Sequence, residues 1–556
     1  MDYAYDLGEL SVPVTTPSKK AQSWFNRGLT WAFGYNHAEA VACFERAIEE
    51  DPDCAMAHWG RAYASGPNYN LPWGRFDEAT RTAALAAGYD SSQAALARVR
   101  DVAPWEAALI EALPARYPQR LPDEYQIMKD WDRSFADAMR QAHRSHTDNL
   151  EVRTVFAEAM LNVTPWKMWD LGTGLPAEGA MTEEAMATLE DALDNNTRAW
   201  RHPGVLHLYI HLMEMSPFPE RALKAGEALR TLVPDAGHLV HMPTHIDVLC
   251  GNYEDVVRWN EAAIRADLDY LRAEGPYNIY SGYRLHNYHF TIYGAMFLGR
   301  FEPAMRAVRG AAETVPEEML RIESPPMADY FESYLSFEPH VLVRFGKWDD
   351  ALAMTMPDDP GLFCTLTANI HYAKGVAHAA LGNVDAAEEE ERAFLDAAAR
   401  VPKTRLLHNN KVVDLLAIGA EMLRGEILYR KGDQEEAFAA LRRSVALDDA
   451  LPYDEPWGWM QPARHALGAL LLEAGRVAEA EAVFRQDLGL GGQRSRATVH
   501  PDNVWSLRGL HDCLEARAET AEIAHVQQRL ELAEARADGR IGAACFCSQA
   551  ALSACS

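Results

Sequence analysis

The sequence predicts an all-α protein, a helical solenoid with irregular middle helices and inserted loops. Alanine-rich stretches with helical patterning recur along the 556 residues, and glycine or proline separates them. A short motif, in which a glycine and a turn precede a helix start, returns several times along the chain. Recurrence at intervals of tens of residues is typical of a repeat array, in which each helix pair buries its apolar face against the next.

The most specific copy of the repeat is WFNRGLTWAFGYNHAEAVACFERAIEEDP, residues 24–52. We expect Gly28 and Ala40 where two antiparallel helices cross closely, and Pro52 at the end of the second helix, because proline cannot continue the hydrogen-bond ladder. This segment closely resembles a tetratricopeptide repeat (TPR) motif. The resemblance implies a TPR-like right-handed solenoid of helix pairs. The residues at the consensus spacing are Trp24, Gly28, Ala40, Phe44, Ala47 and Pro52.

Weaker copies of the same turn follow. Gly375, Gly425 and Gly468 each lie seven residues before a turn glycine, as the motif requires, and Trp505 and Gly509 begin a last helix pair. The predicted turns are GNYEDV (251–256), GRFEPA (299–304), GKWDDA (346–351), GNVDAA (382–387), GDQEEA (432–437) and GRVAEA (475–480).

These patterns divide the chain into five predicted segments. They are an N-terminal segment (1–20), a TPR-like unit with an inserted loop (21–100), an irregular helical region with a histidine cluster (101–320), a C-terminal TPR-like array (321–538) and a Cys/Ser-rich tail (539–556). Two stretches depart from the repeat. Residues 66–100 begin with the Gly/Pro/Asn-rich loop GPNYNLPWGRF, and residues 162–182 are rich in tryptophan, proline and glycine. Long loops of this kind in a helical array often carry function.

Composition and charge exclude several classes of function. The formal net charge of −28 repels phosphate backbones, so we expect no nucleic-acid partner. We expect no membrane association, because no apolar run spans a bilayer, and the first residues do not resemble a secretory signal. The protein is therefore predicted to be cytoplasmic. Glycine-rich nucleotide loops, the GxSxG elbow and CxxC zinc-ribbon pairs are absent from the sequence.

The spacing of histidines is the most informative feature of the chain. Eight of the 20 histidines fall between positions 202 and 289. Within HLYIH, HLVHMPTH and HNYHF they recur at intervals that share a helix face. A metal ion needs several ligands that converge, and neutral imidazole is the commonest of them. The alternatives are a non-metal acid–base or binding pocket and a structural polar core. The predicted ligands are His207, His211, His238, His241, His245, His286 and His289.

The identity of the metal follows from the ligand type. An all-imidazole set suits copper, iron or zinc, and we favour copper, followed by iron or zinc. Carboxylate-bridged di-iron centres use Glu-x-x-His, whereas His211 and Glu214 stand in the reverse order. Pro243 lies between His241 and His245, so it either kinks one helix or begins a new one. Trp166, Trp169, Tyr209 and Tyr288 are predicted to shape a substrate pocket, against the plainer interpretation that aromatic residues there only pack.

The tail ends in IGAACFCSQAALSACS, with Cys545, Cys547 and Cys555 within twelve residues. The plain interpretation is a frayed terminus with incidental thiols. Alternatively, the thiols bind a soft metal ion. The segment also resembles the core of ribosomal peptides that are later modified, which would make it a peptide substrate carried on its own enzyme.

The sequence favours a metal-dependent oxidoreductase, with a copper or iron site in a TPR-like scaffold, acting on a peptide or small molecule. Three alternatives remain open. The first is a non-catalytic TPR scaffold that binds a partner peptide, which the resemblance alone implies. The second is a zinc hydrolase. The third is a peptide-modifying enzyme whose own Cys-rich tail is the substrate.

Overall fold

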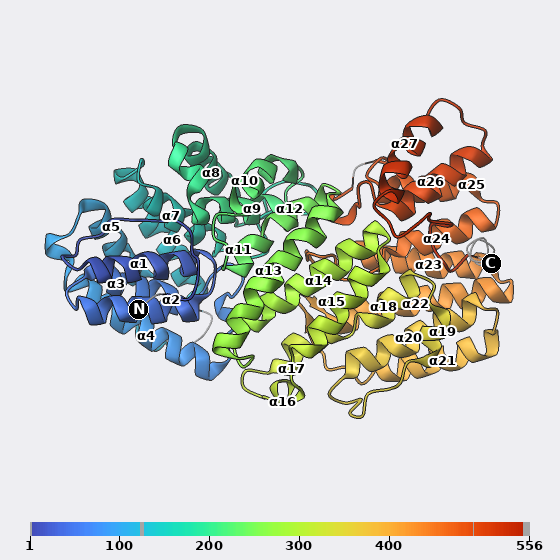
Figure 1. Ribbon diagram of the computed structural model, residues 1–556, viewed down its shortest axis with the longest axis horizontal. Coiled ribbons are helices and arrows are strands. Elements are labelled where there is room, and N and C mark those ends of the chain that lie inside the picture. Colours follow the sequence, from blue (N-terminus) through green and yellow to red (C-terminus); the bar gives the residue numbers. More distant parts are fainter. Residues whose placement is uncertain (1–2, 123–126, 493, 549–556) are drawn as a thin grey trace. The chain divides into compact units, whose positions relative to one another are not determined.

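A computed structural model describes residues 3–122, 127–492 and 494–548 of the chain (Figure 1). The all-α prediction is confirmed, because helices account for nearly all regular structure in these ranges. The exception there is a short hairpin, in which Leu406 pairs with Lys411 and Leu407 with Asn410. The described helices include none that is both long and apolar enough to cross a membrane.

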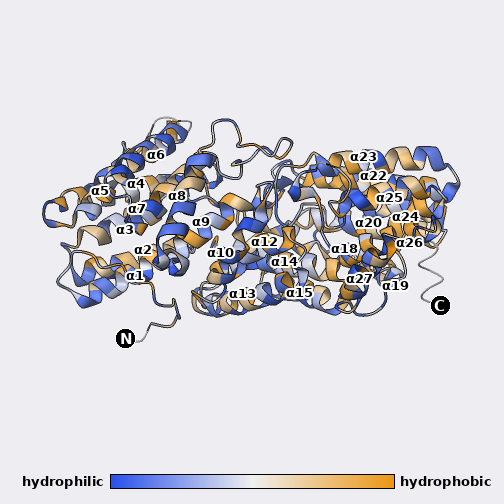
Figure 2. Cartoon of the chain, turned by 90° about the horizontal axis from the view of Figure 1, so that it is seen from above, coloured by the Kyte–Doolittle hydropathy of each residue, from blue (hydrophilic) through white to orange (hydrophobic). Residues whose placement is uncertain are grey.

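The chain folds into two compact units. Unit 1 comprises residues 1–246 and 265–269, and unit 2 comprises residues 247–264 and 270–556. The irregular region predicted at 101–320 is thus divided between both units. Hydrophilic and hydrophobic residues are interleaved along the helices (Figure 2), as expected for helices that bury one side.

Unit 1 begins with the predicted repeat. Its helices are α1 (Lys19–Phe33), α2 (His37–Glu50), α3 (Ala55–Ser65), α4 (Glu78–Leu96), α5 (Pro104–Ala112), α6 (Ile127–Ser145), α7 (Leu150–Leu161), α8 (Thr182–Asn195), α9 (Pro203–Glu214), α10 (Leu223–Leu229) and α11 (Gly237–His241). Helices α12 (Pro243–Leu249) and α13 (Tyr253–Glu274) contribute residues to both units.

Close packing in the first repeat depends on glycine, as predicted. The ring of Phe44 on α2 is fully buried and lies against both Gly28 on α1 and Gly60 on α3. A β-carbon at position 28 would lie 2.8 Å from this ring, so a larger residue cannot be placed there without a shift. The side chain of Asn36 begins α2 by accepting a hydrogen bond from the backbone N–H of Glu39 at 3.2 Å.

The inserted loop of unit 1 is followed by a helix. The stretch 66–100 is irregular only at its start, because residues 78–96 form α4. Asp77 caps this helix by accepting from the backbone N–H of Thr80 at 2.8 Å, and the alanine-rich sequence that follows has high helix propensity. The second predicted loop lies between α7 and α8, where Trp169 and Pro176 form an isolated bridge.

Unit 2 is an array of helix pairs. The six predicted turn glycines all lie between two helices and have positive φ, between 61° at Gly346 and 93° at Gly432. Glycine adopts this conformation at little cost, and it ends the first helix of each pair. The helices that follow α13 are α14 (Ser281–Leu298), α15 (Phe301–Glu313), α16 (Glu317–Leu320), α17 (Met327–Phe331), α18 (Glu338–Arg344), α19 (Trp348–Ala353), α20 (Cys364–Ala380), α21 (Val384–Ala398), α22 (Val412–Lys431), α23 (Gln434–Asp449), α24 (Ala463–Glu473), α25 (Val477–Asp487), α26 (Val504–Ala516) and α27 (Ile523–Glu534).

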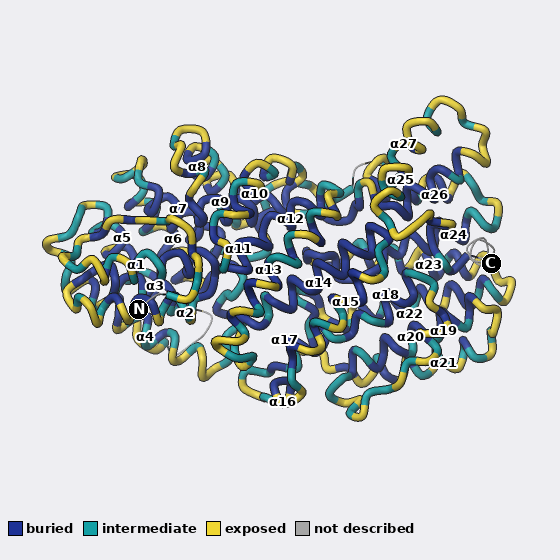
Figure 3. The backbone as a smooth tube through the Cα atoms, viewed as in Figure 1, coloured by how far each residue is buried: buried dark blue, intermediate teal, exposed yellow. Residues whose placement is uncertain are grey.

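Two deeply buried helices, α9 and α14, carry predicted ligand histidines. All 12 residues of α9 are buried, and so is most of α14 (Figure 3). Neither helix has a solvent face, so their polar side chains must find partners inside the protein.

Candidate metal centre

Helix α9 presents three titratable side chains to the interior of unit 1. His207, His211 and Glu214 lie at successive turns of the helix, and all three are fully buried. The helix begins at Pro203, and His202 caps it by accepting from the backbone N–H of Val205 at 3.2 Å. The spacing predicted from HLYIH therefore becomes one polar stripe in an otherwise apolar helix.

Two short helices bring the second group of histidines to the same place. His238 and His241 lie on α11, and Pro243 begins α12 rather than kinking a continuous helix. The break allows His245 to turn back toward α11, so that its Nε2 lies 2.9 Å from Nε2 of His241. Proline at the first position of a helix costs no hydrogen bond.

The two groups meet at His207 and His238, whose Nε2 atoms lie 3.1 Å apart. One nitrogen each from His207, His211 and His238 falls within 4.8 Å of the others. Two imidazoles that share a tetrahedral ion at the usual bond length of about 2.0–2.1 Å place their nitrogens about 3.3 Å apart. The observed geometry therefore fits a tris-imidazole site.

The opposite nitrogens of these rings are held by acceptors. Nδ1 of His207 donates to the carbonyl oxygen of Phe33 at 2.6 Å. Nδ1 of His211 contacts one oxygen of Glu214 at 3.0 Å, and Nδ1 of His245 contacts the other at 3.1 Å. Metal-binding histidines usually donate their second N–H to a carbonyl or carboxylate, which fixes the ring and directs Nε2 to the ion. Glu214 holds His211 in this way, and its second oxygen lies within ion-pair distance of His245.

Burial keeps the imidazoles neutral. It lowers the pKa of His207 to about 3, and it lowers the pKa of His238 well below the usual value, with further contributions from the neighbouring histidines. Burial also raises the pKa of Glu214 well above its usual value. Neutral imidazole is the form that binds metal, so protons do not compete for these nitrogens near neutral pH.

Aromatic rings that the sequence analysis did not single out enclose the site. The ring centroid of Tyr35 lies 4.5 Å from that of His207. The Tyr35 ring also stacks on His211 and His238, with centroid distances of 5.8 and 5.7 Å. Tyr69 lies 4.7 Å from His211. Tyr35 has a positive φ of 56°, which is uncommon for a residue other than glycine. Nothing in the local sequence GYNH indicates that this ring faces histidines far along the chain.

Of the four predicted pocket residues, Trp166 lies beside the histidine cluster, and the other three make contacts elsewhere. Trp166 joins the enclosure, with its ring 5.8 Å from His211. Trp169 donates to the carbonyl oxygen of Leu212 at 2.7 Å, and the hydroxyl of Tyr209 donates to Glu190 at 2.9 Å. Tyr288 belongs to unit 2 and packs against Gly310 of α15.

The last two predicted ligands, His286 and His289, lie on α14 in unit 2, with ring centroids 6.4 Å apart. His286 stacks on His408 at 4.8 Å, whereas Nε2 of His289 lies 3.1 Å from the sulfur of Met460.

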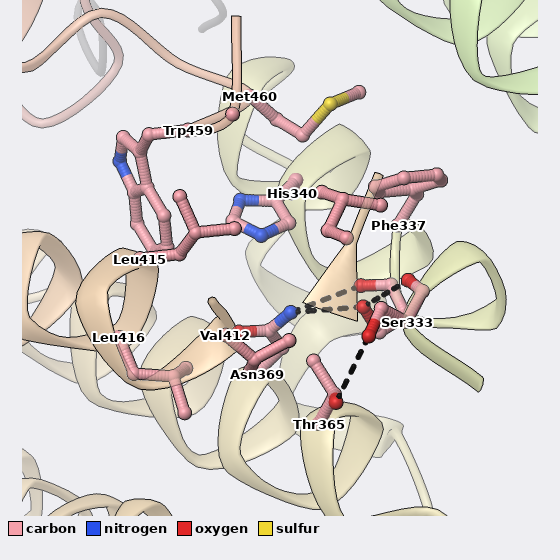
Figure 4. A pocket seen from close by; sticks show the side chains of 13 residues that line it. Ser333, Phe337, His340, Thr365, Asn369, Val412, Leu415, Leu416, Trp459 and Met460 are labelled. Carbon is pink, nitrogen blue, oxygen red and sulfur yellow. Dashed lines mark hydrogen bonds between the residues drawn. The ribbon is translucent and has the colours of Figure 1, made fainter. Parts of the chain in front are cut away.

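Two hollows differ greatly in size. The first, in unit 2, has His340 between Trp459 and Phe337 in its wall (Figure 4). Its volume of about 20 Å³ suits a single water molecule, which the unpartnered Nδ1 of His340 and Oδ1 of Asn369 would bind. The second, in unit 1, measures about 740 Å³ and lies beside Arg198, Arg201 and the start of α9. Only this second hollow has the size of a substrate site.

Two of the three predicted tail thiols lie in the described residues, and both are buried. Cys545 and Cys547 are 9% and 3% exposed, and both are free thiols within unit 2. Cys555 lies outside the described residues.

Comparison with known proteins supports the class that the helix pairs define. Residues 36–65, which include α2 and α3, match the tetratricopeptide repeat family model. The chain therefore contains a tetratricopeptide repeat at residues 36–65, and further helix pairs follow it. The sequence matches no curated protein.

Solved structures with a similar arrangement are distant. One is the IFIT1 monomeric mutant with Gppp-AAAA, at 12% identity over 93% of this chain and 91% of that chain, with a TM-score of 0.30. Another is the APC/C hetero-tetramer Cut9–Hcn1, at 12% identity over 93% and 96%, with a TM-score of 0.23. A third is Naa15/Naa10 bound to HypK-THB, at 12% identity over 96% and 74%, with a TM-score of 0.22.

Proposed function

We propose that this TPR protein is a metalloprotein in which His207, His211 and His238 bind one metal ion, and that it acts as a metal-dependent oxidoreductase. The observation that carries the proposal concerns the two ring nitrogens of His207 and of His211: one is held by a hydrogen-bond acceptor, and the other points to the neighbouring histidines. Nδ1 of His207 and of His211 is anchored at 2.6 and 3.0 Å, while one nitrogen of each converges with that of His238. A metal site requires the imidazole nitrogens to converge on one point, whereas a polar core held by hydrogen bonds does not.

The donor set favours copper over iron. Copper stands highest among divalent metals for nitrogen ligands, and three imidazoles suit it. A non-haem iron site would use a carboxylate as direct ligand, whereas Glu214 is engaged by the Nδ1 atoms of His211 and His245. When bound, copper supplies one-electron chemistry with oxygen. Zinc, which also accepts three imidazoles, would instead support hydrolysis, and it is the nearest alternative.

The chain's own residues have definite tasks in this proposal. The carbonyl of Phe33 and the carboxylate of Glu214 hold the imidazoles in the tautomer that coordinates. Tyr35, Tyr69 and Trp166 exclude water from the site, which strengthens electrostatic interactions within it. The hollow beside Arg198 and Arg201 is the candidate entry for a small-molecule or peptide substrate.

Elemental analysis tests the proposal. The full-length protein, purified without a tag, is expected to hold about one equivalent of copper or another transition metal, and His207→Ala/His211→Ala is expected to lose it. His146→Ala, in unit 1 but outside the cluster, is the matched control and should retain the metal. A wild-type protein that binds no ion after reconstitution with copper, iron or zinc would refute the metal centre. Copper with oxygen consumption favours the oxidoreductase, and zinc without it favours the hydrolase.

The second candidate is a non-catalytic scaffold that binds a partner peptide. The observation that favours it is that unit 2 already holds an irregular segment of the chain, residues 541–548, among its helices. The self-modifying enzyme makes a separate prediction, because it requires a change in the mass of the tail. An intact mass equal to that of the unmodified sequence after turnover would exclude it.

The net charge of the protein and its free cysteines support proposals about its binding partner and its cellular compartment. The net charge of −28 favours a peptide or small molecule over nucleic acid as the partner. Binding to short RNA at low salt would contradict this. The described cysteines are free thiols, which suits the reducing cytoplasm.

A further inference from the structure

An irregular segment in unit 2 is buried as deeply as a core helix. After α27 ends at Glu534, residues 541–548 form no helix or strand. Ile541, Ala543, Ala544, Cys545, Cys547 and Ser548 are nonetheless each at most 9% exposed. Chain ends that lack regular structure are usually exposed unless specific contacts hold them.

Two arginines bind the backbone of this segment. Nη2 of Arg344, at the end of α18, donates to the carbonyl oxygen of Ala544 at 3.0 Å. Arg430, at the end of α22, donates to the carbonyl oxygen of Cys547. Main-chain carbonyls are common to every sequence, so these contacts recognise peptide backbone, here in a segment that turns where the N–H of Ser548 donates to the carbonyl oxygen of Cys545 at 3.3 Å.

Arg344 is held in position by a chain of buried groups. Its Nη1 donates to Nδ1 of His465 at 2.7 Å, and Nε2 of His465 lies 2.9 Å from Asp487. Its guanidinium also lies 4.1 Å from the ring of Trp505. Arg430 is fixed by Glu473 at 2.9 Å. A donor that is oriented before binding loses little entropy when a carbonyl arrives.

One side chain of the segment, the half-buried ring of Phe546, lies against a turn glycine and a second aromatic ring. Phe546 packs against Gly346, where a β-carbon would lie 2.8 Å from the ring, and its centroid lies 6.0 Å from that of Trp505. Ile541 contacts Gly299 in the same manner, at 3.1 Å from where a β-carbon would stand. Turn glycines of two repeats therefore make room for two apolar side chains of the segment.

The thiols lie among charged groups of both signs. The backbone N–H of Cys547 donates to the sulfur of Cys545 at 3.3 Å. The hydrogen bond between the two thiols lowers the pKa of Cys545 to about 7 against the effect of burial, and Arg344 and Arg430 contribute in the same direction. Burial raises the pKa of Cys547 well above its usual value, and the nearby carboxyl of Glu426 adds to this.

We propose that unit 2 contains a binding site for a peptide that turns at one aromatic side chain between small residues, and that residues 541–548 occupy this site in cis. Arg344 and Arg430 bind its carbonyls, and the space over Gly346 and beside Trp505 accepts its aromatic ring. A peptide of the same chemistry on another molecule competes with the resident segment for the site. The inference is independent of the metal centre in unit 1.

A labelled peptide tests the site directly. The probe is GRIGAACFCS, residues 539–548, under reducing conditions, and the host is the full-length protein. Phe546→Ala in the host weakens the resident segment, so we expect it to bind the probe at least 10-fold more tightly than the wild type does. Arg430→Gln added to the same host should abolish the gain, and a probe with alanine in place of phenylalanine should not bind.

Thiol labelling separates displacement from misfolding. In Phe546→Ala, Cys545 and Cys547 should react faster with a maleimide than in the wild type, while Cys513 on α26, which is fully buried, stays protected. Equal probe binding by wild type and variant would overturn the proposal. So would exposed tail thiols without probe binding, or tail thiols that stay protected in the variant.

Discussion

Glu214 and His211 lie on the same face of α9, and the carboxylate oxygen Oε1 contacts Nδ1 of the imidazole at 3.0 Å. Neither side chain has any exposed surface. The second oxygen of the carboxylate lies within ion-pair distance of His245, so a single acid contacts two rings from different helices. An isolated buried carboxyl is costly, and its place between two imidazoles is what a second shell of a metal centre requires.

Glu214→Gln should weaken metal binding without unfolding the protein. Glutamine keeps the shape but loses the acceptor strength of one oxygen, and loss of such outer partners typically lowers metal affinity about 10–100-fold. Titration of the metal-free protein with copper or zinc measures the change. Glu190→Gln, which neutralises the carboxylate that accepts from Tyr209 in the same unit, is the control and should not alter affinity. Unchanged affinity in Glu214→Gln would show that the carboxylate does not orient the ligands.

Glu158→Gln should change how stability depends on pH. Burial in α7 raises the pKa of Glu158 to about 8. A group with a raised folded pKa contributes stability below its unfolded pKa, and that contribution is lost as pH rises toward 8. The variant lacks this loss, so its free energy of unfolding relative to wild type should increase by up to about 1.4 kcal/mol per pH unit between pH 5 and 8.

Urea denaturation at pH 5, 6.5 and 8 measures this difference. Glu183→Gln, on the first turn of α8, is an exposed control and should follow the wild type at each pH. A relative stability of Glu158→Gln that stays constant or falls with rising pH would show that the carboxyl ionises freely in the folded state.

The fold could be predicted because its signals are local. Gly432 is needed for the positive φ of a turn, and Gly28 is needed where two helices of a pair pack closely. The structure shows both glycines in these expected roles. The loop after α3 could be predicted from the glycine, proline and asparagine residues at its start, and the alanine-rich residues from Glu78 onward form a capped helix.

The histidine cluster was only partly predictable. Helical spacing placed His207 with His211, and the structure adds His238 from α11 at 3.1 Å. Helical periodicity carries no information about contacts between residues far apart in sequence. The contacts that the carbonyl of Phe33 and the ring of Tyr35 make with the histidines could therefore not be predicted. Nor could the sequence show that Arg344 and Arg430 bind the carbonyls of Ala544 and Cys547, because backbone groups leave no pattern.

Gly60→Ala should destabilise unit 1. An added methyl group on α3 would meet the buried ring of Phe44, which already lies against Gly28. Overpacking of this kind typically costs about 1–3 kcal/mol. Gly172→Ala, in the loop before α8, is the matched control, because its nearest neighbour would be a side-chain oxygen of Asp170 at 3.5 Å. Chemical denaturation of both variants measures the difference, and equal stabilities would mean that Phe44 can move aside.

Metal binding should stabilise the folded protein in a concentration-dependent way. The ligands come from α9 and α11 and are assembled only on folding, so an ion that binds the folded state adds to its stability. At a free metal concentration 100 times the dissociation constant, the gain is about 2.7 kcal/mol. Thermal melting of the metal-free protein with increasing copper should therefore show a rising midpoint, and His207→Ala/His211→Ala should show none. His525→Ala, exposed on α27 in unit 2, should behave as wild type. If the double variant is stabilised as much as the wild type, the ion binds elsewhere, and the convergence of His207, His211 and His238 serves the packing of the core alone.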